Sequence, residues 1–177
     1  MNDPNGLIQW KGQYHLFYQH NPGEAVWGNM HWGHAVSADL IHWRHLPIAL
    51  APEPDGPDAF GVFSGCAVDN DGIPTLVYTG VAPPETQCIA TGSDDLVTWT
   101  KYEGNPVIAG PPDEFEVTGF RDPKVWRDGD TWDMVVGSGI EGKGGAVLLY
   151  RSPDLINWTY LRPLHIGDAD KTGPMWE

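Results

Sequence analysis

The segment SADLIHW at Ser37–Trp43 occurs twice more in the chain, as SDDLVTW at Ser93–Trp99 and as SPDLINW at Ser152–Trp158. All three copies follow the pattern Ser-x-Asp-Leu-x-x-Trp, and they recur at nearly equal intervals. Such a period in a turn-rich chain is typical of β-propellers, in which each repeat is one small antiparallel sheet. The Asp can cap a turn by accepting hydrogen bonds from backbone N–H groups, and the Leu and Trp can pack between neighbouring sheets. We therefore interpret the repeat as structural and assign it no chemistry.

Two strands are expected before each copy of the repeat. An apolar strand comes first, and after a loop a second strand runs into the repeat. The expected first strands are Tyr14–Gln19, Pro74–Gly80 and Thr131–Gly139, and the second strands are His31–Ser37, Gln87–Ser93 and Ala146–Ser152. The sequence therefore predicts an all-β fold that contains about three propeller blades.

Composition agrees with a turn-rich β domain and excludes several functions. The chain has 177 residues with 22 Gly, 16 Pro and 9 Trp. A net charge of −14 disfavours nucleic acid as a partner. No apolar run approaches the roughly 20 residues of a membrane span. The His residues lack metal-ligand spacing, and Cys66 and Cys88 are expected to be free and buried. We expect no metal or other cofactor, no nucleic acid and no membrane association, and the oligomeric state stays open.

Two motif matches point to functions that the surrounding sequence disfavours. Gly137–Gly142 fits GxGxxG, but a dinucleotide site needs a helix next, and the run that follows, Ala146–Tyr150, is typical of a strand. The repeat also resembles the Asp-box of sialidases, but all three copies lack the usual Gly before the last three positions. Neither a nucleotide site nor a sialidase is expected.

Three short stretches are polar where the repeat predicts ordinary strand or loop: Asn2–Gly6, Phe120–Pro123 and Met175–Glu177. Each carries one carboxylate beside aromatic or proline residues. Glycoside hydrolysis needs two carboxyl groups, one as nucleophile or base and one as acid. The innermost strands of successive blades line one central cavity, where residues distant in sequence can converge. Taken alone, each Asp also fits a solvated turn residue, since Asp-Pro and Asn-Gly are common turn pairs.

The whole chain resembles glycoside hydrolase family 32, which contains invertases, sucrose-6-phosphate hydrolases, inulinases, levanases and fructan exohydrolases. The matching motifs, in family order, are MNDPNG at 1–6, FYQHNP at 17–22, WGHAVS at 32–37, FSGCA at 63–67, FRDPKVW at 120–126 and MWE at 175–177. In FSGCA, Cys66 stands where Ser is frequent. The resemblance implies a five-bladed β-propeller followed by a β-sandwich.

The resemblance also implies the roles of three acids. Asp3 corresponds to the nucleophile, Glu177 to the general acid/base, and Asp122 to the residue that binds sugar hydroxyls and stabilises the transition state. Further positions correspond to the fructosyl pocket: Asn2, Gln19, Trp27, Phe63, Ser64 and Arg121. The implied reaction is cleavage of terminal β-D-fructofuranosides by double displacement with retention. Alternatives are a fructosyltransferase on the same scaffold and a non-catalytic carbohydrate-binding propeller.

This mechanism gives expectations for the environment of each acid. Asp3, Asp122 and Glu177 should lie on inner strands around one axis, with nucleophile and acid about 5–5.5 Å apart. Apolar neighbours such as Met175 and Trp176 should keep the Glu177 carboxyl protonated, and backbone N–H groups of the Asn-Gly turn should keep Asp3 ionised. The Arg121 guanidinium should offset repulsion among the three carboxylates.

The resemblance also implies how much of the catalytic domain this chain contains. Residues 1–177 should form the N-terminal blades of the catalytic propeller, with the C-terminal blades and the β-sandwich outside this chain. Two blade faces would then be uncovered. Residues 1–177 expressed alone are therefore expected to be insoluble or unstable, and inactive on sucrose.

Overall fold

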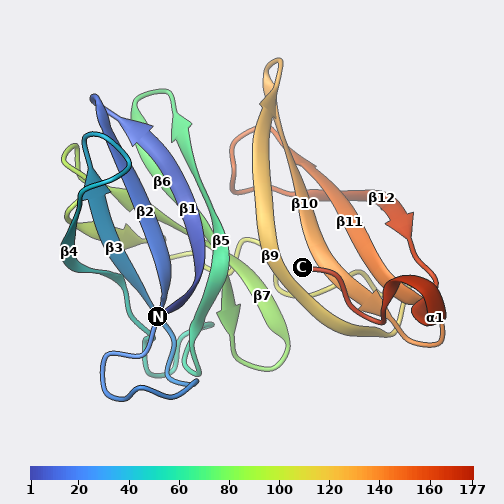
Figure 1. Cartoon of the computed structure of the whole chain (residues 1–177). Helices are drawn as coiled ribbons and strands as arrows, with labels where there is room; N and C mark the ends of the chain where they lie inside the picture. The colour runs from blue at the N-terminus through green and yellow to red at the C-terminus, as the bar shows by residue number, and fades with distance from the viewer.

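The computed structural model describes all 177 residues, which form three four-stranded antiparallel sheets in sequence order (Figure 1). Blade 1 contains β1 (Asn2–Trp10), β2 (Gln13–His20), β3 (His31–Ser37) and β4 (Trp43–Leu50). Blade 2 contains β5 (Val62–Asn70), β6 (Ile73–Val81), β7 (Glu85–Gly92) and β8 (Trp99–Lys101). Blade 3 contains β9 (Val117–Asp128), β10 (Thr131–Ile140), β11 (Gly144–Ser152) and β12 (Thr159–Ile166). The predicted all-β fold is confirmed.

Within each blade the strands pair in chain order, as in a meander. The predicted first strands fall on β2, β6 and β10, and the predicted second strands fall on β3, β7 and β11. The only helix is α1 (Ala169–Thr172), which is followed by an extended segment to Glu177. No helix has the length and apolar character that crossing a membrane requires.

The first strand of each blade lies on the inside of the assembly. β5 lies between β1 and β9 in Figure 1, and it contacts both of them. Since β1, β5 and β9 carry the stretches around Asp3, Ser64 and Asp122, the blade arrangement brings these residues to a common region.

The repeated turns have the capping geometry that the sequence predicts. Asp39 Oδ1 accepts hydrogen bonds from the backbone N–H groups of Ile41 (2.9 Å) and His42 (2.8 Å). Asp154 Oδ1 accepts equivalent bonds at 2.9 and 2.8 Å. The Leu of each copy has a positive φ of 59–67°. In each copy the indole N–H of the Trp donates to the carbonyl of that Leu. The three turns are therefore the same structural unit.

The expected packing of the repeat holds for the second and third copies. Leu96 and Leu155 are fully buried. Leu155 belongs to the core between blades 2 and 3, and Trp99 packs edge-on against Phe17 of blade 1. In the first copy, however, Leu40 is 53% exposed. The second and third copies pack towards the preceding blade, whereas Leu40 is not covered by any part of residues 1–177, so this part of the expectation is wrong for Leu40.

Two apolar cores join the blades. One lies between blades 1 and 2 and includes Phe17, Trp32 and Leu76, and the other lies between blades 2 and 3. The thiols of Cys66 and Cys88 are free and buried in these cores, as expected. Burial raises the pKa of Cys66 to about 11, so this thiol stays protonated and unreactive at neutral pH.

Candidate active site

One open pocket of about 900 Å³ lies where the inner strands meet. Asp3, Asp122 and Glu177 all line it. The same pocket is lined by five of the six predicted sugar-binding residues: Gln19, Trp27, Phe63, Ser64 and Arg121. Asn2 is not a lining residue, but its amide donates a hydrogen bond to Asp3 Oδ2 at 2.8 Å. The structure thus brings together residues from the first strand of every blade and from the chain end.

An interruption of strand pairing places a side chain into the pocket in each blade. The register shifts at Asp3 in β1, at Ser64 in β5, and between Arg121 and Lys124 in β9. β-Bulges of this kind re-aim side chains next to active sites. Asp3 and Asp122 have φ values of 41° and 60°, a left-handed conformation that is strained for residues other than Gly. Such strain at two pocket carboxylates is typical of a functional site.

Asp3 is held by two asparagines. Besides the bond from Asn2, the amide of Asn5 donates to the Asp3 carbonyl (3.2 Å) and to Ser64 Oγ (3.3 Å). Asn5 is buried, and it joins β1 to β5 beneath the pocket. The expectation that an Asn-Gly turn donates to Asp3 is wrong, because the segment is part of β1 and the donor to the carboxylate is the Asn2 side chain.

Asp122 is the most buried of the three acids. Burial, together with the negative charges of Glu177, Glu85 and Asp3, raises the pKa of this carboxyl to about 6. The Arg121 guanidinium opposes this rise. Asp122 therefore titrates close to neutral pH and responds to the charge of both other acids.

Glu177 has an environment that differs from the expected one. It does not lie on an inner strand but follows α1, in an extended segment that runs along β10, where Trp176 N–H donates to the Ser138 carbonyl (3.2 Å; the chain end in Figure 1). Its side chain is 57% exposed, so the expected apolar enclosure is wrong. Trp176 instead stacks on His165, with 5.4 Å between ring centroids.

The glycines of the rejected GxGxxG match explain how this segment fits. A Cβ at Gly137 would lie 2.5 Å from the Trp176 carbonyl oxygen, and one at Gly139 would lie 2.4 Å from the Pro174 carbonyl oxygen. β10 therefore needs Gly at both positions so that the segment carrying Glu177 can approach.

Arg121 joins two acids, as its expected charge role requires. Its Nε and Nη2 atoms donate to Glu177 Oε1 at 2.8 and 2.6 Å, and its Nη1 donates to Glu85 Oε1 at 3.1 Å. Sequence reasoning did not identify Glu85. The signal available was an acidic residue directly after Pro83-Pro84, at the start of a strand, but its partner lies in another blade.

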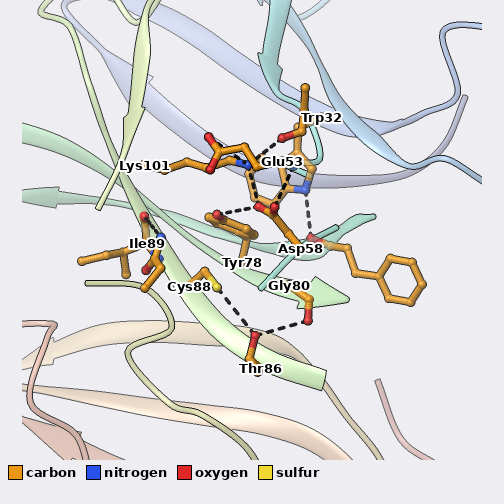
Figure 2. Close-up of polar contacts among 12 residues, drawn as sticks. Trp32, Glu53, Asp58, Tyr78, Gly80, Thr86, Cys88, Ile89 and Lys101 are labelled. Carbon is orange, nitrogen blue, oxygen red and sulfur yellow. Dashed lines mark hydrogen bonds and ion pairs between the residues drawn. The ribbon is translucent and has the colours of Figure 1, made fainter. Parts of the chain in front are cut away.

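The remaining pocket residues provide an aromatic wall backed by polar contacts. Trp27 is exposed, and its ring meets Phe63 edge-on at 6.0 Å between centroids. Rings of this kind can stack on the apolar face of a sugar. Gln19 is buried and donates to the Val62 carbonyl at 3.0 Å. The Trp32 indole, labelled in Figure 2, donates to the Phe63 carbonyl at 2.9 Å.

A buried polar cluster holds the loop that leads into β5 (Figure 2). Asp58 is fully buried, and its carboxylate accepts hydrogen bonds from Tyr78 OH (3.0 Å) and from the Glu53 backbone N–H (3.0 Å). Lys101 Nζ pairs with the same carboxylate at 2.6 Å. The cluster thereby fixes the approach to Phe63 and Ser64 from outside the pocket. No group of three or more His, Cys, Asp or Glu side chains is arranged to hold a metal ion.

Comparison with known sequences gives matches over the whole chain. Residues 1–177 match the family described as glycosyl hydrolases family 32 N-terminal domain. The chain is 49% identical to sucrose-6-phosphate hydrolase of Escherichia coli over 187 residues, which cover 100% of this chain and 38% of that protein. It is 41% identical to levanase of Bacillus subtilis, of which it covers 26%. The chain therefore spans well under half the length of these relatives.

Solved structures show the same fold. The β-fructofuranosidase BmSUC1 of Bombyx mori superposes with a TM-score of 0.87 at 49% identity, covering 100% of this chain and 38% of that one. Fructan 1-exohydrolase IIa of Cichorium intybus superposes with a TM-score of 0.89 at 38% identity, covering 100% of this chain and 34% of that one. The three sheets are accordingly blades of a β-propeller, and the chain belongs to glycosyl hydrolase family 32, whose N-terminal domain it matches from residue 1 to residue 177.

Proposed function

We propose that this chain carries the catalytic acids of a glycosidase that cleaves terminal β-D-fructofuranosides with retention. The observation that carries the proposal is the pocket in which Asp3, Asp122 and Glu177 meet an aromatic wall, in a chain of this family. Relatives are named for hydrolysis of sucrose 6-phosphate and levan. A variant of the Bombyx mori enzyme was solved with sucrose, and a variant of the Cichorium intybus enzyme with 1-kestose. The substrate class is therefore a small or oligomeric fructoside.

The first step assigns Asp3 as nucleophile and Glu177 as acid. The Asp3 carboxylate attacks the anomeric carbon while Glu177 gives its proton to the departing oxygen. In the second step Glu177 accepts a proton from water, which displaces Asp3 and restores both groups. Because Arg121 also pairs with Glu85, its charge keeps a partner whenever Glu177 is neutral.

Asp122 has the third role in this proposal. Its carboxylate accepts hydrogen bonds from hydroxyls of the fructosyl unit, and its negative charge stabilises the positive charge that develops on the ring at the transition state. Burial strengthens this interaction, since the local dielectric constant is lower than that of water. The aromatic pair of Trp27 and Phe63 positions the apolar face of the sugar.

We infer that residues 1–177 are the N-terminal blades of a larger catalytic propeller. The exposed Leu40 and Trp43 on blade 1 support this, because the equivalent residues of blades 2 and 3 pack against a preceding blade.

Incubation of the full-length protein with sucrose tests the function. We expect free fructose and glucose in equal amounts, and we expect Asp3→Asn to abolish release while the protein still melts cooperatively. The second candidate is a fructosyltransferase, favoured by 42% identity to 6(G)-fructosyltransferase of Asparagus officinalis, and it would form kestose-type oligomers instead. Sugar binding without turnover would indicate a non-catalytic propeller and overturn the proposal.

A further inference from the structure

The backbone that carries Asp122 is held by side chains of a different blade. Thr79 Oγ1, on β6, accepts a hydrogen bond from the Asp122 N–H at 3.0 Å. Gln87 Nε2, on β7, donates to the Phe120 carbonyl at 2.8 Å. Glu85 Oε2 accepts from the Phe120 N–H at 2.6 Å. Blade 2 therefore contacts β9 just before and at the point where the backbone turns left-handed.

Thr79 and Gln87 also form a hydrogen bond with each other, and this bond determines which group donates and which accepts in their contacts with β9. The Thr79 hydroxyl donates to Gln87 Oε1 at 2.9 Å. A hydroxyl has a single proton, so once it is given to Gln87, the oxygen can only accept from Asp122. The opposite orientation of the Gln87 amide would set its oxygen against the Phe120 carbonyl. The arrangement is therefore the one orientation in which each group has a partner.

Both residues are completely buried, and neither lines the pocket. Buried hydrogen bonds of this kind have no water to replace a lost partner, so they define a geometry strongly. Asp122 has a φ of 60°, which an L-residue keeps only when its surroundings enforce it. The N–H bond to Thr79 lies at the strained residue itself.

We propose that Thr79 and Gln87 are positioning residues for Asp122: from blade 2 they hold the left-handed backbone of β9 so that the Asp122 carboxylate points into the pocket. This inference rests on the proposed function for its kinetic consequence. It makes the geometry of the site depend on the alignment of blade 2 with blade 3. Glu85 contributes to the same backbone contact but also binds Arg121, so Thr79 is the cleaner position for a test.

Three threonine variants of the full-length protein separate positioning from general stability. Thr79→Val keeps the shape and removes the acceptor, Thr79→Ser keeps the hydroxyl, and Thr75→Val is the matched control. Thr75 is also buried on β6, but its hydroxyl donates only to the Ile73 carbonyl. We expect Thr79→Val to lower kcat on sucrose about 10- to 100-fold with little change in KM, because misplacement of a catalytic group by about 1 Å can lower the rate about 100-fold. Thr79→Ser and Thr75→Val should stay within about threefold of the unsubstituted protein.

Two results would overturn the inference. One is an unchanged kcat in Thr79→Val, and the other is an equal loss in Thr75→Val or Thr79→Ser, which would indicate a purely structural role. If the unsubstituted protein releases no fructose, the proposed function fails instead. The crystal structure of Thr79→Val then still decides the positioning question: we expect the Asp122 backbone to leave its left-handed conformation, and an unmoved Asp122 would contradict the inference.

Discussion

Among single residues, Asp122 combines backbone strain, burial and charge crowding. Its φ is 60°, and the three neighbouring carboxylates oppose its ionisation. Arg121 reduces this repulsion and at the same time binds Glu177. When Asp122 is ionised, it therefore lowers the stability of the fold. The proposed role of its charge in catalysis explains why a destabilising residue occupies this position.

Asp122→Asn should stabilise the folded protein at neutral pH. The folded pKa of about 6 lies above the usual 3.8, so the folded state binds more protons between these values. The stability that this gives is fully present below pH 3.8 and is lost as the pH rises through 6. Replacing the carboxyl should raise the free energy of unfolding at pH 8 by up to about 3 kcal/mol, and much less at pH 4. Denaturant titrations measure this, with Asp130→Asn as an exposed control. An equal gain at both pH values would contradict the buried charge.

Glu177→Gln should affect substrates according to their leaving group. A poor leaving group such as the glucose of sucrose needs protonation, so its turnover should fall about 100-fold or more. An activated fructoside with a good leaving group should lose far less in the first step. Parallel assays of both substrates measure the difference, with Glu141→Gln on an exposed turn as the control. Equal losses on both substrates would exclude the acid role.

The sequence identified eight residues that line the pocket, namely the three acids and five sugar-binding candidates, but not the side chains that hold them in place. The motifs around Asp3 and Asp122 are local, so they could be read from the chain. Asn5, Glu85 and Thr79 act through partners 35 to 59 residues away, in other blades. Such pairings depend on how blades are aligned, and no local pattern encodes them.

At the scale of strands, β2 and β3 share a buried pair of imidazoles. His15 Nδ1 lies 2.9 Å from His34 Nε2, and both side chains are buried. His34 stacks on Phe17, and its Nδ1 atom is buried without a partner. Burial, with a further contribution from His15, lowers the pKa of His34 to about 3. The pair is stable only while both rings are neutral.

Acid should therefore weaken the contact between these strands. In the unfolded chain His34 is protonated below about pH 6.5, whereas in the folded protein its pKa is about 3. The free energy of unfolding therefore falls as the pH drops from 6.5 to 3. The slope should be about 1.4 kcal/mol per pH unit for this one proton. His34→Gln should have a slope smaller by that amount between pH 6 and 4 than the unsubstituted protein. Unfolding titrations across this range provide the measurement, and parallel slopes would rule out the pair as an acid-sensitive contact.

The strands that sequence analysis missed have physical reasons for being missed. The outer strands β4 and β12 are mostly exposed, and β8 has only three residues, so none has a periodic apolar face. Asp3 and Asp122 were expected on inner strands, but the bounds of β1 and β9 were not predicted, because Pro, Gly and carboxylates at their bulges are typical of turns. The central strands of each blade are buried on both faces, and they were predicted correctly.

At the scale of the whole molecule, stability comes from contacts between blades. Leu155 is buried in the core between blades 2 and 3, and Leu96 is also fully buried, whereas Leu40 is exposed in the equivalent turn. Covering that face would remove Leu40 and Trp43 from water and would close the edge of the assembly. Substitution of Leu40, the equivalent of Leu155 in the first copy of the repeat, therefore tests whether another blade covers blade 1.

Leu155→Ala should destabilise the protein by about 2–5 kcal/mol, because it leaves a cavity in a packed core. Leu40→Ala should cost about as much in the full-length protein if another blade covers this side chain. Denaturant unfolding of the two full-length variants measures both effects. A negligible effect of Leu40→Ala in the full-length protein would show that blade 1 has no neighbour there.

The central claim is that Asp3 attacks a fructosyl unit in a pocket shared with Asp122 and Glu177. The most direct measurement is to trap the intermediate: the full-length Glu177→Gln protein is mixed with an activated fructoside, digested, and examined by mass spectrometry. The first step proceeds without an acid, while the second lacks its base, so the covalent form should accumulate. We expect the fructosyl group on the peptide that contains Asp3, and no adduct in the Asp3→Asn, Glu177→Gln double variant. A fructosyl group on Asp122, or release of fructose from the double variant at an undiminished rate, would contradict the account.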